Sequence, residues 1–246
     1  MYIGAHVNSS GGVWKAIGNG ADIGCEAIQI FAGSPRTWAP TLYKDGDAKR
    51  FREAREASAI RFVVIHTIYL INLASAREDF YEKSVTSLAG AVAAAEQLGA
   101  DAIVTHVGSH QGAGFAAGLE RVRAALLRAL AESEGSDVRL LLENTAGAGT
   151  TFGGGIEELG SVLHGLDAAG VARAVHANDC LFGQGEHKDR HAWIGEGTIG
   201  EAGFAAMLAQ ERLTGVPALL EMPGEMPVKD VENIDRLKRL RGDAPA

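Results

Sequence analysis

The feature that most constrains the fold of this chain is a repeated alternation of short apolar runs with longer amphipathic stretches. Seven runs have the length and composition of buried strands in a parallel sheet. They are Tyr2–Val7, Ala27–Phe31, Phe62–His66, Ala102–Val107, Val138–Glu143, Ala172–His176 and Pro217–Glu221. Helical stripes lie between or after several of them: Leu88, Val92, Ala95 and Leu98; Leu119, Val122, Leu126 and Ala129; and Val231, Ile234, Leu237 and Leu240. Strands that alternate with helices predict βαβ units with right-handed crossovers.

This pattern predicts an α/β fold of the TIM-type (β/α) barrel class, in a single domain over residues 1–246. No linker rich in Pro, Gly and Ser interrupts the chain, and no block of like charge does so. A closed barrel of this class has eight strands. A count of seven therefore means either that the pattern misses a strand or that one β/α unit is absent.

The charge balance limits how the protein can meet its partners. Acidic residues outnumber basic residues by 31 to 23, which gives a formal net charge of −8. A protein that binds nucleic acid through net positive charge has the opposite sign. Bound divalent cations can still supply positive charge where a phosphate sits. The composition therefore argues against simple electrostatic binding to DNA, and leaves open an enzyme that binds metal ions.

The sequence indicates a cytoplasmic protein. Cys25 and Cys180 are too few for a disulfide framework, which favours a reducing compartment. The amino terminus has no basic region followed by an apolar core, so no secretory signal is visible. No apolar run approaches the roughly 20 residues that a membrane-spanning helix needs.

Residues that can ligate a metal ion stand at the ends of five predicted strands. They are His66, His106, Glu143, His176 and Glu221. The carboxyl ends of the strands form the active-site rim of an α/β barrel. Imidazole and carboxylate groups are ligands of zinc and similar cations. One such residue at a strand end is more often structural, but five on one rim predict a metal centre.

A loop adds two candidate ligands, Asp189 and His191, in the tripeptide Asp189–His191. Such a turn can direct both side chains at one ion, although by itself it more often belongs to a solvated loop. The nearby stretch Gly195–Gly200 matches the GxGxxG nucleotide-binding pattern, but no strand precedes it. We therefore interpret it as the entry turn of a helix. The sequence also contains no Walker A motif, no HExxH and no GxSxG.

Seven motifs resemble the endonuclease IV family, whose zinc-dependent members cleave DNA at abasic sites. They follow the family order along nearly the whole chain: Gly4–Val7, Tyr69–Leu73, His106–His110, Leu142–Gly147, His176–Asp179, Asp189–His191 and Ile194–Gly197. The resemblance implies a TIM barrel with three zinc ions. It also implies hydrolysis of the phosphodiester 5′ to an abasic nucleotide, without a nucleophile from the protein.

The resemblance distributes the candidate ligands over three zinc sites. Site by site, they are His66, His106 and Glu143; Glu143, His176 and Glu221; and Asp189 and His191. Glu143 is thus shared by two ions and is the residue with an implied catalytic role. Arg36, Tyr69 and Leu70 match family loop residues that bind DNA and enter the duplex at the lesion. The alternative for Tyr69 and Leu70 is ordinary packing under a loop.

The chain departs from the family pattern after the fifth predicted strand. There the family has a further strand that ends in Asp-Thr-Cys-His, and this Asp and His ligate the second and third ions. No Asp-x-x-His occurs between residues 166 and 172. A strand-plus-helix unit of about 30 residues or more is therefore absent, which explains the seven strands. We expect two tightly held zinc ions instead of three, unless His187, Asp179 or Cys180 joins the third site.

Three functions are consistent with these observations. The first is a DNA-repair endonuclease that acts at abasic sites in damaged double-stranded DNA, with activity reduced by the missing ligands. The second is a sugar isomerase or epimerase on the same kind of barrel, which also uses His and Glu ligands but needs no wedge residues. The third is a non-catalytic protein that binds DNA lesions. In each case we expect a monomer with no membrane partner.

Overall fold

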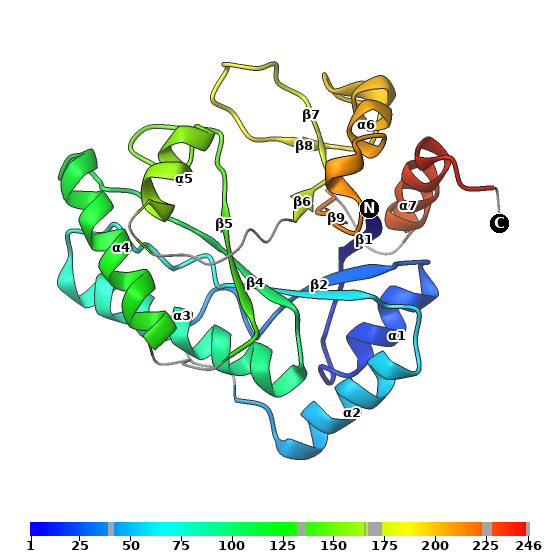
Figure 1. Cartoon of the computed structure of the whole chain (residues 1–246), viewed down its shortest axis with the longest axis horizontal. Helices are drawn as coiled ribbons and strands as arrows, with labels where there is room; N and C mark the ends of the chain where they lie inside the picture. The colour runs from blue at the N-terminus through cyan, green and yellow to red at the C-terminus, as the bar shows by residue number, and fades with distance from the viewer. Residues whose placement is uncertain (39–41, 132–135, 165, 167–173, 223–227, 245–246) are drawn as a thin grey trace. The chain divides into compact units, whose positions relative to one another are not determined.

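Parallel strands with helices between them form the framework of the protein (Figure 1). The computed structural model describes residues 1–38, 42–131, 136–164, 166, 174–222 and 228–244. The chain forms two compact units, which we call unit 1 and unit 2. Unit 1 comprises Met1–Ile30, Gly46–Val64 and Arg173–Ala246, and unit 2 comprises Phe31–Asp45 and Ile65–Ala172. The expectation of a single domain over the whole chain stays a prediction.

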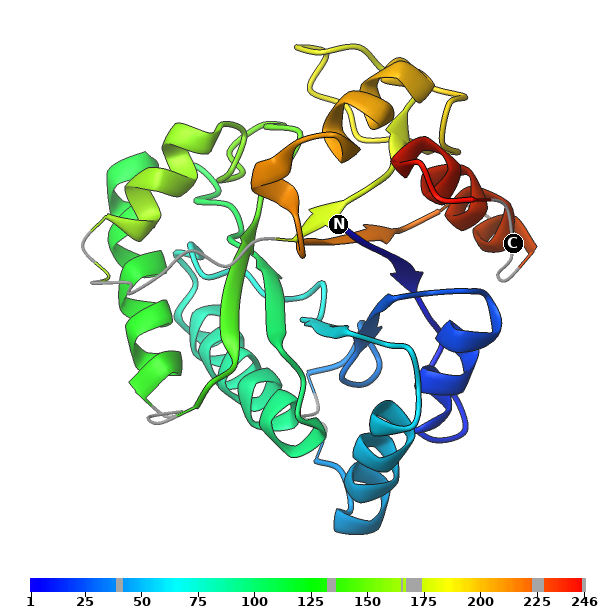
Figure 2. The ribbon, with the colours of Figure 1, turned by 45° about the vertical axis from the view of Figure 1, so that its right-hand side comes forward.

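Unit 1 contains parallel strands in the order β2-β1-β9-β6. Their bounds are Tyr2–His6 for β1, Ala27–Phe31 for β2, Val175–His176 for β6 and Pro217–Leu220 for β9. Figure 2 shows β9 in orange and β6 in yellow near β1 in dark blue, in agreement with the strand pairing. Gly4 is paired with Ala27 of β2, and a Cβ at Gly4 would overlap the Ala27 carbonyl group. A glycine is therefore required where β1 meets β2.

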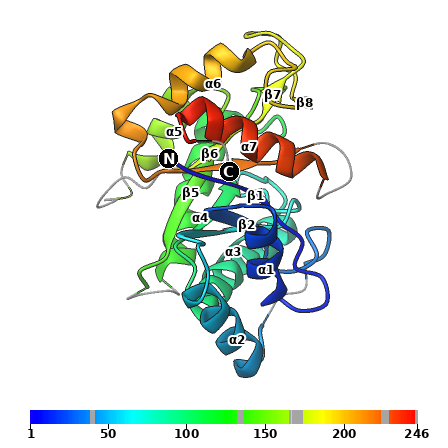
Figure 3. The ribbon, with the colours of Figure 1, turned by 90° about the vertical axis from the view of Figure 1, so that its right-hand side faces the viewer.

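The helices of unit 1 are α1 (Lys15–Asp22), α2 (Asp45–Glu56), α6 (Gly200–Leu208) and α7 (Val228–Arg241), with a 3-10 turn η1 (Glu211–Leu213). Helix α7 packs against α6 and against β1 and β9 (Figure 3). The predicted apolar stripe of α7 is right at Ile234 and Leu237, which are fully buried, and wrong at Val231, which is 37% exposed. Asn233 is buried instead, because its side chain accepts the Ile194 N–H and donates to the Lys229 carbonyl.

Unit 2 contains the parallel pair β4 and β5 and the carboxyl end of β3. These strands are Ala102–His106 for β4, Arg139–Glu143 for β5 and Phe62–His66 for β3. Just after β3, the Thr67 N–H donates to the Val104 carbonyl of β4 at 3.0 Å. Helices α3 (Glu78–Leu98) and α4 (Phe115–Ala131) pack side by side, and α5 (Ile156–Leu163) packs on α4 (Figure 1). The predicted stripes of α3 and α4 supply this core, since Leu88, Leu98 and Leu126 are fully buried.

All seven predicted strands are present, as β1 to β6 and β9. The sixth strand, β6, is shorter than predicted. The first residues expected for it, and the shortened connection expected before it, fall within 167–173, which lie outside the described residues. Two further strands, β7 (Asp179–Cys180) and β8 (His191–Ala192), form an antiparallel pair that the sequence pattern did not indicate. Among the described residues, no helix is long and apolar enough to cross a bilayer.

Candidate metal centre

In unit 2, His66, His106 and Glu143 form one cluster at the carboxyl ends of three successive strands. The Nε2 atom of His66 lies 3.3 Å from Glu143 Oε2, and that of His106 lies 3.6 Å from the same oxygen. One ligand atom from each of the three lies within 4.8 Å of the others, a separation that one ion can span. The sequence predicted this trio, and the structure brings it together.

The surroundings of His66 determine which ring nitrogen faces Glu143. His66 is 2% exposed, and its Nδ1 lies 2.7 Å from the Thr67 carbonyl oxygen. Because a carbonyl only accepts, Nδ1 carries a proton, and in the neutral ring Nε2 presents a lone pair towards the carboxylate. Two such acceptors repel each other unless a positive charge lies between them. Two imidazoles and a carboxylate form a ligand set that fits zinc, and the hydrogen bond from His66 Nδ1 orients one of the rings.

In unit 1, His176 and Glu221 meet at the ends of β6 and β9. The His176 Nδ1 atom lies 3.6 Å from Glu221 Oε2. The backbone N–H of Glu221 donates to the Asn178 side chain at 2.7 Å, which ties the end of β9 to the segment after β6. His6 and Gln29, which the sequence analysis did not select as site residues, contact this pair. The available signal was Gln29, a polar residue inside an otherwise apolar strand.

Asp189 lies in the segment that joins β7 to β8, and His191 is the first residue of β8, also in unit 1. His191 Nε2 lies 3.3 Å from Asp189 Oδ1, and His191 Nδ1 donates to the backbone carbonyl of Glu221 at 2.7 Å. His191 thus has one nitrogen held by a carbonyl and the other directed at a carboxylate, as His66 does. The Asp189 side chain is 65% exposed. This pair offers two ligands in an open position.

Asp179 does not serve as an additional ligand for that pair. Its carboxylate is fully buried and accepts four backbone N–H groups at 2.9 to 3.1 Å, from Cys180, Gly195, Ile199 and Gly200. Burial alone would raise the pKa of Asp179, but these N–H groups hold it below its usual value. The hydrogen bonds also fold Gly195–Gly200 into the turn that begins α6, so the interpretation as a helix-entry turn is confirmed.

The predicted DNA-binding residues lie on two joined loops of unit 2. The Tyr69 N–H donates to the Pro35 carbonyl at 3.1 Å, which ties the Tyr69 loop to the one that carries Arg36. The Tyr69 side chain is 58% exposed, and its ring makes edge contacts with Phe31 and with His66, at 5.2 and 5.8 Å between centroids. Leu70 is half-buried and Arg36 is exposed. Their role in DNA binding stays a prediction.

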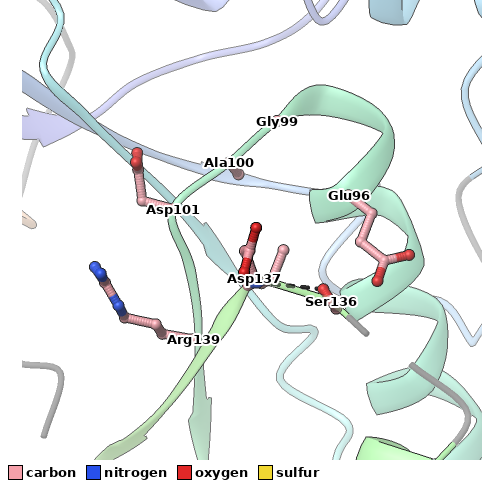
Figure 4. A pocket seen from close by; sticks show the side chains of 8 residues that line it. Glu96, Gly99, Ala100, Asp101, Ser136, Asp137 and Arg139 are labelled. Carbon is pink, nitrogen blue, oxygen red and sulfur yellow. Dashed lines mark hydrogen bonds between the residues drawn. The ribbon is translucent and has the colours of Figure 1, made fainter. Parts of the chain in front are cut away.

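A cavity of about 510 Å³ opens at the amino ends of β4 and β5 (Figure 4). It is lined by Glu96, Gly99, Ala100, Asp101, Ser136, Asp137, Val138 and Arg139. His106 and Glu143 stand at the opposite ends of the same two strands. Because the cavity is lined by no imidazole and lies away from the cluster, we assign it no part in the metal chemistry.

Comparison with known proteins identifies the group to which this chain is similar. Residues 17–172 match the family model described as Xylose isomerase-like TIM barrel. The protein named Probable endonuclease 4 from Methanoculleus marisnigri is 37% identical, and the match covers 98% of this chain and 99% of the relative. The protein of the same name from Halothermothrix orenii is 33% identical, with 97% and 100% covered.

Solved structures agree with the sequence relatives. The crystal structure of endonuclease IV from Thermus thermophilus matches with a TM-score of 0.85 and 32% identity, over 99% of this chain and 100% of that chain. A D-tagatose 3-epimerase-like protein matches with a TM-score of 0.77 and 18% identity, over 98% and 97%, which shows a shared fold alone. The predicted TIM-type barrel class is confirmed.

The aligned relatives are longer than this chain, by about the length of the strand-plus-helix unit that the sequence lacks. The match to the Methanoculleus marisnigri relative extends over 280 positions, whereas this chain has 246 residues, so at least 34 positions of the relative have no counterpart here. That number agrees with the expected absence of a strand-plus-helix unit of about 30 residues or more.

Proposed function

This chain belongs to the endonuclease IV family, and from that premise we propose that it hydrolyses the phosphodiester 5′ to an abasic nucleotide in double-stranded DNA, with zinc as its cofactor. Family membership makes the chain a metal-dependent DNA phosphodiesterase. The observation that carries the proposal is the cluster of His66, His106 and Glu143, whose ligand atoms lie within 4.8 Å of one another at the ends of successive strands.

We assign the ligands as the resemblance implies. On that resemblance, His66, His106 and Glu143 would hold the first ion, and His176 and Glu221 would hold the second, to which the resemblance also assigns Glu143. Asp189 and His191 offer a third position with two ligands, which is fewer than the three or four of an ordinary zinc site. We therefore propose two tightly held ions.

The residues of the chain orient the metal ligands, and the ions would supply the electrophilic chemistry. When bound, zinc stabilises the negative charge on the transferring phosphate and lowers the pKa of water. The Thr67 carbonyl keeps the His66 ring turned with Nε2 towards Glu143. No protein nucleophile is needed, in agreement with the lack of a GxSxG motif in the sequence.

The exposed loops fit the task of opening the duplex at the lesion. Opening a base stack costs a few kcal/mol, and an aromatic or apolar wedge offsets part of that cost. Tyr69 offers an exposed ring beside His66, and Leu70 is its apolar neighbour. Arg36, on the adjoining loop, offers a guanidinium for a phosphate.

The decisive experiment uses a labelled duplex that contains one tetrahydrofuran analogue of an abasic site. We expect cleavage on the 5′ side of the analogue, loss of cleavage after chelation and recovery with zinc. His106→Ala should lose cleavage, and the matched control His164→Ala, an exposed histidine that follows α5, should retain it. Binding without cleavage would favour a lesion-binding protein. If the protein neither binds nor cleaves this duplex, the proposal is overturned and the sugar isomerase alternative is left.

Elemental analysis of the purified protein tests the metal count, which we expect to be about two zinc ions per chain. Three ions at full occupancy would show that other residues compensate for the missing ligands. We further propose a cytoplasmic monomer, and light scattering during size-exclusion chromatography tests its oligomeric state.

A further inference from the structure

Gln29 is a fully buried polar residue in the middle of β2, with an exposed fraction of 0%. Its neighbours Ile28 and Ile30 are equally buried, but side chains alternate along a strand, so theirs point to the opposite face from the Gln29 amide. A primary amide withdrawn from water costs free energy unless its donors and acceptor are satisfied. The partners that satisfy Gln29 therefore indicate what the residue does.

Three side chains surround the amide, all within unit 1. Gln29 Nε2 donates to Glu221 Oε1 at 2.6 Å and lies 3.1 Å from His6 Nδ1. Gln29 Oε1 lies 2.9 Å from His176 Nε2. This orientation of the amide is forced, because a flipped amide would place its carbonyl oxygen against the Glu221 carboxylate.

The amide orientation determines the state of His176. Since Gln29 Oε1 can only accept, His176 must carry a proton on Nε2. In the neutral ring the lone pair then belongs to Nδ1, which lies 3.6 Å from Glu221 Oε2. The same amide holds the other carboxylate oxygen, Oε1. One side chain thus directs Nδ1 of the histidine and Oε2 of the glutamate towards each other.

His176 differs in this respect from the other oriented histidines. His66 and His191 are each held by a backbone carbonyl, which no substitution removes. His176 is held by a side chain that can be replaced. The orientation of this one ring can therefore be tested by mutation.

We propose that Gln29 is a positioning residue for metal binding, which selects Nδ1 of His176 and Oε2 of Glu221 as the ligand atoms. The inference rests on the proposed function, in that His176 and Glu221 are taken to hold an ion. Hydrogen bonds of this kind to metal ligands typically contribute 10- to 100-fold in metal affinity.

The test replaces Gln29 by methionine, which has a similar length and no comparable hydrogen-bonding group. The matched control is Ile30→Val, on the same strand and equally buried. Zinc affinity is measured by competition with a chromophoric chelator. Q29M should weaken one class of zinc site by about 10- to 100-fold, and I30V should bind zinc as the wild type does. Equal zinc affinity in Q29M and wild type would overturn the proposal.

A second measurement needs no metal, and its deciding readout comes from the wild-type protein alone. In zinc-free wild-type protein with 15N-labelled histidine, long-range 1H–15N spectra identify the protonated ring nitrogen of neutral His176. Protonation at Nε2 is expected in the wild type and should be lost or mixed in Q29M. Protonation at Nδ1 in the wild type would refute the inference. Failure of the wild type to bind zinc would refute the proposed function instead, so the two failures are distinguishable.

Discussion

Replacing Asp179 by asparagine removes the acceptor that organises the segment after β6. Oδ1 accepts the N–H groups of Cys180 and Ile199, and Oδ2 accepts those of Gly195 and Gly200. Asparagine keeps one oxygen, and its NH2 group would face two backbone N–H donors. A hydrogen bond to a charged group contributes about 1.5–3 kcal/mol, so the loss of two should cost about 3–6 kcal/mol. This is a large share of the roughly 5–15 kcal/mol that stabilises a typical domain.

Equilibrium unfolding in urea measures this loss, with Asp22→Asn in α1 as the exposed control. The control should change the free energy of unfolding by no more than about 0.5 kcal/mol. A loss below about 1 kcal/mol in D179N would refute the reasoning. The pH dependence has a definite sign. Because the pKa of Asp179 is lowered in the folded protein, its contribution is present above the ordinary aspartate pKa and disappears as the pH falls through the folded value. D179N should lack this acid-dependent component.

Three further predictions concern other parts of the chain. Arg241→Met should lower the free energy of unfolding by about 1–3 kcal/mol in thermal or urea unfolding, because Arg241 donates to both oxygens of Glu26; a double-mutant cycle with Glu26→Gln should show strong coupling. Tyr69→Ala should weaken binding to the abasic-analogue duplex by about 1–3 kcal/mol with unchanged zinc content; a fall in zinc content would contradict a role in DNA contact. Burial raises the pKa of Cys25 to about 12, so iodoacetamide should label the half-exposed Cys180 first, and mass spectrometry that finds Cys25 labelled first would be contrary evidence.

The strands could be predicted because buried parallel strands are continuous apolar runs in the sequence. Ala27–Phe31 and Phe62–His66 agree with β2 and β3 at both ends. The pair β7 and β8 could not be predicted in this way, because each has two residues and no apolar run. Its residues pair through their backbones, and the Asp179 carboxylate ties β7 to the turn before α6 through backbone N–H groups, which residue types do not reveal.

The candidate ligands could be predicted because the active-site side chains of an α/β barrel stand at the carboxyl ends of its strands. That rule found His66, His106 and Glu143 without any contact information. It missed Gln29, because a positioning residue lies within a strand and acts through its neighbours. The wrong prediction of Val231 as buried has a related cause. The helical pattern takes only apolar residues into account, whereas the buried position is filled by Asn233, whose side chain is hydrogen-bonded to the backbone.

The acidic composition and the proposed substrate are reconciled only through the metal ions. The candidate clusters contain Glu143, Glu221 and Asp189, and without bound cations these carboxylates would repel a DNA phosphate. The two zinc ions that we propose would add about four positive charges where the phosphate must sit, whereas the chain as a whole carries −8. We therefore expect zinc occupancy and DNA affinity to be coupled. Because such coupling is reciprocal, a duplex that binds the zinc-loaded protein more tightly must raise zinc affinity by the same factor.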